Sequence, residues 1–120
     1  MKKLLIIDDA AFMRLAIRNM LLNYEIEISG EAADGAIGVE MYKQLRPDVV
    51  TMDITMPKMS GLEALKAIKA FDPQAKVIMV SAMGQERIVK EAIISGAKTF
   101  IVKPFKEEHL YQTICKVLGI

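Results

Sequence analysis

The sequence predicts an α/β protein, a doubly wound parallel sheet of five strands with helices on both faces. Three observations indicate this fold class: short apolar runs alternate five times with helical segments, the connections are a few residues long, and four of the five runs lack polar alternation. Strands of a parallel sheet are buried on both faces and read as continuous apolar runs. Repeated β–α alternation brings such strands into one parallel sheet.

The expected strands are residues 4–7, 25–29, 48–53, 76–81 and 98–103. Residues 25–29 alternate apolar and polar side chains, which is typical of a half-exposed edge strand. The other four have an uninterrupted apolar centre. We therefore expect those four to be buried on both faces of the sheet.

The expected helices are residues 13–21, 35–45, 62–68, 89–93 and 110–118. In most of these segments apolar side chains recur at intervals of three and four residues, so that one stripe of the helix can face the sheet. Gly38 disfavours a helix in the second segment. Asp34 can nevertheless cap the start of that segment, and Arg46-Pro47 would end it.

In the fourth helical segment Val89, Ala92 and Ile93 form the apolar stripe that we expect to be buried. Gly96 is placed to end this helix, because glycine is the usual residue after a helix C-terminus. Ile94 lies off the stripe, so we expect it to be exposed. It is then either a contact for another protein or a singly exposed apolar side chain without a role.

The composition limits the classes of protein that the chain can belong to. The 120 residues suit one domain, and a net charge of +1 argues against a protein that binds nucleic acid through a basic face. One Cys and one His exclude a disulfide framework and a Cys- or His-rich metal site. No apolar run approaches the roughly 20 residues that span a bilayer, and the first run is too short for a signal peptide. We therefore expect a soluble cytoplasmic protein without membrane contact.

Side chains able to do chemistry stand where the predicted strands end: Asp8, Asp9, Asp53, Ser81 and Lys103. Ligands of open parallel sheets bind beyond the carboxyl ends of the strands. Taken singly, each of these aspartates is a helix N-cap or a turn residue. If their strands are neighbours, however, three carboxylates repel one another at close range, and a bound Mg²⁺ explains why such a cluster is present.

Four motifs follow one another along the chain: Ile6-Ile7-Asp8-Asp9, Thr51-Met52-Asp53-Ile54-Thr55-Met56-Pro57 with Gly61, Val80-Ser81-Ala82, and Phe100-Ile101-Val102-Lys103-Pro104-Phe105. In this order and spacing they resemble the CheY-like response regulator receiver domains of two-component signalling, and within them the stand-alone chemotaxis members. The resemblance implies a flavodoxin-like (βα)5 fold with strand order 2-1-3-4-5. It also implies a single receiver domain over residues 1–120 with no output domain.

By this resemblance Asp53 is the phosphoacceptor, which takes a phosphoryl group from a phosphohistidine of a partner kinase. The resemblance further implies one Mg²⁺ per domain. Asp9, Asp53 and the backbone carbonyl of Thr55 would bind it directly, and Asp8 would help to hold it through water. Because a carboxylate and a phosphoryl group repel each other, catalysis is mostly charge neutralisation and positioning.

The resemblance gives Lys103 and Ser81 catalytic roles: Lys103 supplies positive charge to the phosphoryl oxygens, and the Ser81 hydroxyl donates a hydrogen bond to them. Ser81 and Phe100 would form the switch, in which the hydroxyl moves toward the phosphoryl group and the aromatic ring turns inward behind it. The output face is expected on the fourth helix, fifth strand and fifth helix. The Lys103-Pro104 peptide bond is cis in the family.

In the family, the residues two positions after the phosphoacceptor and after the switch hydroxyl tune hydrolysis of the acyl phosphate. Here they are Thr55 and Met83. Neither side chain strongly orients an attacking water, so we expect slow self-dephosphorylation. The protein would be a signalling switch rather than an enzyme, although it catalyses its own phosphorylation and dephosphorylation.

The resemblance also implies partners: a CheA-like sensor histidine kinase, a flagellar motor switch protein or other output protein, and a phosphatase. We expect a monomer that contacts neither nucleic acid nor membrane. Chemotaxis signalling to the motor switch is the expected role. A single-domain phosphorelay intermediate, or a regulator of another pathway, is the alternative.

Three other interpretations stay open at this point. A flavin-binding electron carrier would need a Ser-, Thr- or Gly-rich phosphate loop where Asp8-Asp9-Ala10-Ala11 stands. A phosphatase acting on small metabolites usually has an Asp-x-Asp motif after one strand, whereas here the acidic pair is contiguous. A degenerate receiver used only for interactions would lack the phosphoacceptor, the acidic pair or the lysine, all of which are present.

Overall fold

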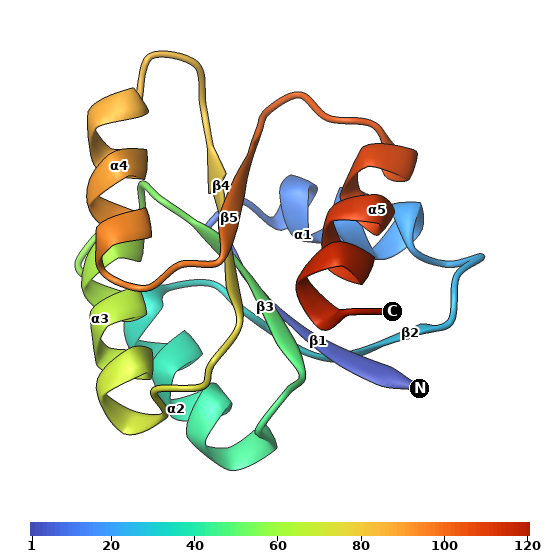
Figure 1. The fold of residues 1–120 in the computed structure, drawn as a ribbon, viewed down its shortest axis with the longest axis horizontal. Helices are drawn as coiled ribbons and strands as arrows, with labels where there is room; N and C mark the ends of the chain where they lie inside the picture. Colours follow the sequence, from blue (N-terminus) through green and yellow to red (C-terminus); the bar gives the residue numbers. More distant parts are fainter.

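The computed structural model describes all 120 residues. The strands are β1 (Lys2–Ile7), β2 (Ile26–Ala32), β3 (Val49–Asp53), β4 (Val77–Ser81) and β5 (Thr99–Val102). The helices are α1 (Ala11–Met20), α2 (Gly35–Leu45), α3 (Gly61–Phe71), α4 (Glu86–Ile94) and α5 (Glu107–Leu118). All neighbouring strands are parallel in the order β2-β1-β3-β4-β5, which confirms the predicted fold class (Figure 1). None of the helices combines the length and the hydrophobicity needed to cross a membrane.

Helices cover both faces of the sheet. In Figure 1, α2, α3 and α4 lie on one side of the strands and α1 and α5 on the other. The first side encloses a cluster of 18 buried apolar residues and the second a cluster of 11. Leu5 and Ile7 of β1 belong to the first cluster, and Leu4 and Ile6 to the second. The uninterrupted apolar run of β1 therefore has the predicted cause, burial on both faces.

The edge strand β2 covers Ile26–Ala32, so it extends beyond the predicted residues 25–29. Its pairing with β1 shifts after Leu4, which leaves Ser29 as an extra residue in the strand. The Ser29 hydroxyl donates to the Leu4 carbonyl at 3.2 Å. The period-two pattern ends at this bulge, which is why the pattern predicted a strand that stops too early.

Helix α2 forms as predicted, although a glycine lies inside it. The Asp34 carboxylate accepts a hydrogen bond from the Ile37 N–H at 2.8 Å and caps the helix. A Cβ on Gly38 would lie 2.6 Å from the Cδ1 atom of Ile7. Gly38 thus lowers the helix propensity but allows α2 to pack closely on the sheet. The helix ends at Arg46, whose backbone is left-handed with φ of 48°.

Helix α4 buries less of its surface than the sequence predicts. Val89 and Ala92 are buried, but Ile93 is 41% exposed, so the prediction that Ile93 faces the core is wrong. The helix is nine residues long, and only the line through Val89 and Ala92 reaches the sheet. Ile94 is 76% exposed, as expected for a residue off the stripe. Gly96 follows the helix with φ of 112°, in the role predicted for it.

Candidate functional site

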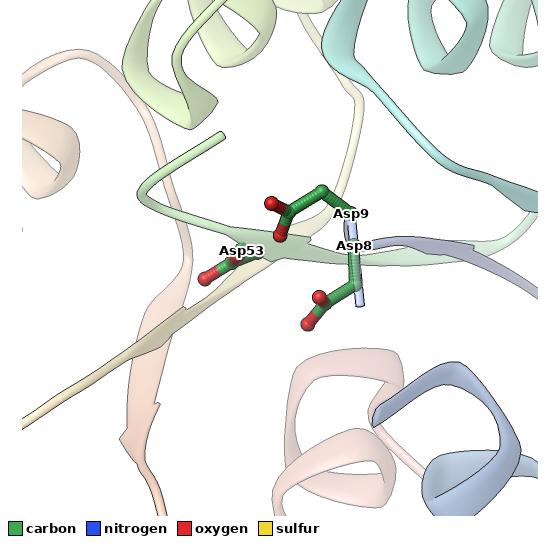
Figure 2. A group of neighbouring side chains, drawn as sticks. All are labelled: Asp8, Asp9 and Asp53. Carbon is green, nitrogen blue, oxygen red and sulfur yellow. The ribbon is translucent and has the colours of Figure 1, made fainter. Parts of the chain in front are cut away.

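Three carboxylates meet at the carboxyl-terminal edge of the sheet (Figure 2). Asp8 and Asp9 directly follow β1, and Asp53 is the last residue of β3, its neighbour in the sheet. One carboxylate oxygen from each residue lies within 4.8 Å of those from the other two. In Figure 2 the three carboxyl groups point to the same side. The structure therefore brings together the three acidic residues that the sequence analysis singled out.

The buried Asp8 is fixed by several hydrogen bonds. Its Oδ1 accepts from the Ala10 N–H at 2.9 Å, and its carbonyl accepts from Nη1 of Arg14 at 2.7 Å. Its own N–H donates to the Ala32 carbonyl at the end of β2. The other carboxylate oxygen, Oδ2, is buried and accepts no hydrogen bond. Asp8 is thus positioned by its neighbours, while Oδ2 has no hydrogen-bond donor and only the ammonium group of Lys103 nearby, at 3.5 Å.

Lys103 lies between two of the three carboxylates. Its Nζ is 3.5 Å from Oδ2 of Asp8 and 3.5 Å from Oδ1 of Asp53. These distances are long for charge-assisted hydrogen bonds, so the ammonium group acts on both carboxylates mainly through its charge. The Lys103 N–H donates to the Ser81 carbonyl at 2.8 Å, and the peptide bond to Pro104 is cis, as the resemblance implied.

The environment of Asp53 opposes its ionisation. Burial and the negative charge of Asp8 raise the pKa of Asp53 to about 6, and the positive charge of Lys103 only partly offsets them. Asp9 raises the pKa further through a hydrogen bond and its charge. The cause is loss of hydration together with repulsion between like charges. Without a bound cation, the cluster is therefore a site of unfavourable electrostatic energy.

Gly61, the first residue of α3, allows the helix to begin directly against Asp53. A Cβ at this position would overlap the Asp53 carbonyl oxygen and come within 2.8 Å of the Ile54 Cα. The Gly61 N–H also donates to the Ile54 carbonyl at 2.8 Å. Because backbone atoms cannot yield to a new side chain, only glycine fits here. The backbone of Asp53 is thus held by the start of α3.

The residues of the cluster fit a magnesium ion. All the side-chain donors are carboxylate oxygens, which hard divalent cations prefer. When all groups are ionised, Asp8, Asp9 and Asp53 together with Lys103 leave two negative charges uncompensated. The buried Oδ2 of Asp8 accepts no hydrogen bond and has only the long 3.5 Å contact with Lys103, which is a further reason to expect a ligand. Asp9 is exposed, so that water can complete the coordination.

The remaining predicted site residues are not members of this cluster. Ser81 is buried at the end of β4, and its hydroxyl donates to the Ile101 carbonyl at the long distance of 3.5 Å. Thr55 is exposed on the loop after β3. Phe100 of β5 is 42% exposed, so its ring is not enclosed behind Ser81. Met83 is 83% exposed on the loop after β4.

Two supports of the site were not predicted from the sequence. Arg14, which holds the carbonyl of Asp8, is itself held by Glu31, with 3.3 Å from Nε to Oε1. Gln85, at the start of α4, donates a hydrogen bond to Thr55 across the loops that follow β3 and β4. Glutamine is not a usual helix N-cap, but its residue type alone does not indicate Thr55 as a partner.

The chain matches a known family over almost its whole length. Residues 4–115 match the family described as response regulator receiver domain. The Bacillus subtilis protein CcdB is 55% identical over 119 residues, covering 99% of each chain. The chemotaxis protein CheY of Thermotoga maritima is 52% identical over 116 residues, covering 97% of each chain. At these identities over nearly the full length, both proteins are close relatives of this chain.

A solved structure shares the fold closely. It is CheY of Borrelia burgdorferi in a complex with CheX, BeF3 and magnesium. Its TM-score is 0.92 at 42% identity, and the match covers 97% of this chain and 88% of that chain. The arrangement of strands and helices described above is thus that of a receiver domain.

Proposed function

The chain belongs to the response regulator receiver domain family, and it is closely related to CheY chemotaxis proteins; we propose that it is a switch in which Asp53 accepts a phosphoryl group. Residues 1–120 act as a single receiver domain in this proposal. The protein is a signalling switch, and its only chemistry is its own phosphorylation and slow dephosphorylation. A cytoplasmic location follows from the kinase that it needs as phosphodonor.

One observation carries the proposal: three carboxylates and Lys103 converge where β1, β3 and β5 end. The cluster has the charge to hold a cation, and the ammonium group lies 3.5 Å from Asp53, the proposed acceptor. A flavin phosphate would be repelled by this cluster. Asp8 and Asp9 leave β1 while Asp53 ends β3, which differs from the Asp-x-Asp arrangement of small-metabolite phosphatases.

In the proposed reaction a carboxylate oxygen of Asp53 attacks the phosphorus of a kinase phosphohistidine. The new O–P bond forms as the P–N bond breaks, and the electron pair leaves with the imidazole, which takes a proton from water. Lys103 offsets the negative charge of the phosphoryl oxygens, and Ser81 donates its hydroxyl hydrogen to one of them. Magnesium held by Asp8, Asp9, Asp53 and the Thr55 carbonyl would neutralise charge on the phosphoryl oxygens.

The switch would use Ser81 and Phe100. In the present structure the Ser81 hydroxyl makes one long hydrogen bond, so little opposes its rotation toward a phosphoryl group. Phe100 lies at a groove of about 550 Å³ between α4 and β5, which Ile93, Ile94 and Val102 also line. Turning the ring inward would reshape this groove. The α4–β5–α5 face is therefore the proposed output surface.

The proposed partners are those of chemotaxis: a CheA-like histidine kinase, the flagellar motor switch and a phosphatase. The similarity to CheY of T. maritima and to the CheX-bound CheY supports this choice. A single-domain phosphorelay intermediate is the alternative. It is supported by CcdB, a relative of the same similarity that is not named a chemotaxis protein.

The experiment is phosphorylation by acetyl phosphate with Mg²⁺, followed by intact-mass spectrometry. The wild type should gain one phosphoryl group and Asp53→Asn none. Asp48→Asn is the matched control. Asp48 directly precedes β3, at the end of the strand opposite to Asp53, so this substitution should leave labelling unchanged. No labelling of the wild type, or equal labelling of Asp53→Asn, would refute the proposal.

The same labelled protein tests the slow dephosphorylation. Thr55 and Met83 are exposed and neither offers a carboxylate or amide to orient water. After removal of acetyl phosphate, we expect the acyl phosphate to persist for minutes. Loss of the label within seconds, with Mg²⁺ and no phosphatase present, would contradict this part of the proposal.

A further inference from the structure

One side chain joins the two loops that flank Asp53. Gln85 occupies the N-cap position of α4, yet its side chain makes no cap hydrogen bond to the helix. Its Oε1 accepts from the Ala82 N–H at 2.7 Å, and its Nε2 donates to the Thr55 hydroxyl oxygen at 2.7 Å. No other side-chain hydrogen bond links the loop after β3 to the loop after β4.

The orientation of the Gln85 amide follows from its partners. A backbone N–H can only donate, so the carbonyl oxygen of the amide must face Ala82 and the NH₂ group must face Thr55. The intervening Gly84 has φ of 89° and no atom near the place of a Cβ. Glycine is therefore required there for its backbone conformation, which lets Gln85 fold back over the loop.

The bridge ends next to the residues that must move. Ala82 directly follows Ser81, and Thr55 lies two residues after Asp53. If Ser81 moves toward a phosphoryl group on Asp53 together with its backbone, the adjacent Ala82 is drawn in the same direction. In the present structure the Ala82 N–H is already bonded to Gln85. Movement of Ser81 and the hydrogen bond of Ala82 to Gln85 therefore oppose each other.

We propose that Gln85 is a latch, which holds the Ser81–Gln85 loop in its unphosphorylated arrangement and opens when Asp53 is phosphorylated. This inference rests on the function proposed above. Gln85 is a positioning residue, because it acts through Ala82 and Thr55 and does not touch Asp53. A ligand of the activated state binds only molecules in which the latch is open. Its apparent affinity is therefore reduced in proportion to the fraction of molecules that are open.

The test measures the binding of beryllofluoride with Mg²⁺ by fluorine NMR. Gln85→Leu keeps the size of the side chain and removes both hydrogen bonds. We expect it to bind beryllofluoride about threefold to tenfold more tightly than the wild type, which corresponds to one or two modest hydrogen bonds. Thr55→Val removes only the bond between the loops, so its gain should be smaller. The double variant should gain no more than Gln85→Leu, because both changes remove the same contact.

A second measurement reports on the latch without any ligand. In metal-free protein, hydrogen exchange of the Ala82 amide should be about fivefold or more faster in Gln85→Leu than in the wild type. Gln44→Leu is the matched control, since Gln44 is an exposed helical glutamine remote from these loops with no side-chain hydrogen bond. It should change neither affinity nor exchange, and thermal unfolding verifies that each variant folds.

The contrary results are distinct. If Gln85→Leu speeds exchange at Ala82 but binds beryllofluoride as the wild type does or more weakly, the bridge exists without acting as a latch. Unchanged exchange at Ala82 would show that Gln85 does not hold the loop, which also overturns the inference. If the wild type binds beryllofluoride no better than Asp53→Asn, the proposed function fails and the latch with it. In that case the ligand-free exchange still tells whether the bridge forms.

Discussion

The helices α3 and α4 follow neighbouring strands of the same sheet, yet they are built in different ways. Helix α3 begins with a capping box, in which the Ser60 side chain bonds the Glu63 N–H and the Glu63 side chain bonds the Ser60 N–H. Helix α4 has no side-chain cap. Leu65 and Ile68 of α3 are fully buried, whereas α4 leaves Ile94 largely exposed.

This difference suits the two helices to different tasks: α3 holds the site in place, and α4 can move in the proposed switch. Helix α3 holds the backbone of the proposed phosphoacceptor, so movement there would displace Asp53 itself. Helix α4 adjoins Ser81 and the groove beside Phe100, where the proposed switch would change the surface that a partner contacts. Its start is secured by Gln85, whose bonds run to the loops rather than to the helix. An uncapped helix with few buried side chains can shift at a small cost in free energy.

The largest expected effect comes from truncating one apolar side chain in each helix, the buried Leu65 of α3 and the exposed Ile94 of α4. Leu65→Ala in α3 should lower the free energy of unfolding by about 3 kcal/mol, because it leaves a cavity among fully buried neighbours. Ile94→Ala in α4 should lower it by less than about 0.5 kcal/mol, because the side chain is 76% exposed. Urea unfolding followed by circular dichroism measures both. Losses of similar size would remove the contrast between the helices.

The next effect concerns the carboxylate that α3 holds in place. In metal-free protein at about pH 7.5, Asp53→Asn should raise the free energy of unfolding by about 1–2 kcal/mol, because it removes a repelled and poorly hydrated charge. The pKa of Asp53 is raised from 3.8 to about 6 in the folded protein. Below the lower pKa, Asp53 is protonated in both the folded and the unfolded protein. As the pH rises to and through the higher pKa, the folded wild type loses stability, because the unfolded chain gives up this proton more readily. The gain from the substitution should therefore vanish near pH 4.

Urea unfolding at several pH values, with a chelator present, measures this difference. Addition of Mg²⁺ should stabilise the wild type more than Asp53→Asn, because a bound cation relieves the repulsion among the carboxylates. A gain that is independent of pH between about 4 and 7.5 would show that the effect is not electrostatic.

The smallest effect tests the starts of the helices. Ser60→Ala should lower the free energy of unfolding by about 1 kcal/mol, because the Glu63 N–H loses its acceptor. Ser60→Asp keeps an acceptor at the N-cap and should be close to the wild type. Helix α4 has no such bond to lose. If Ser60→Ala were as stable as the wild type, the capping box would not account for the firmer start of α3.

The fold class and the candidate residues of the acidic cluster could be predicted because both follow from short-range patterns, whereas the strand order was implied by the family resemblance. Asp8 and Asp53 stand where apolar runs stop, and parallel strands bring such positions to one edge. Ile93 was predicted wrongly because spacing along a helix gives the direction of a stripe and not its width. The end of β2 was missed because the extra residue Ser29 breaks the period of two.

The Gln85 bridge could not be predicted because its contacts depend on tertiary structure. Its partner Thr55 is 30 residues away in the chain, and neither a glutamine nor a threonine indicates by its residue type that the two form a hydrogen bond. The long contacts of Lys103 to Asp8 and Asp53 are of the same kind, since they depend on how three strands end in space. Sequence patterns thus identify the groups of the site, while the distances between them require the packed sheet.

The close approach of Gly61 to Asp53 has a consequence for genetics. In a library of random substitutions screened for loss of signalling, position 61 should score among the most sensitive, although it has no side chain and takes part in no chemistry. Any replacement adds an atom where the Asp53 carbonyl already lies. The proposed phosphorylation site therefore depends on a space beside Asp53 that must stay empty. A mutation that fills this space would abolish the proposed switch without altering any reactive group.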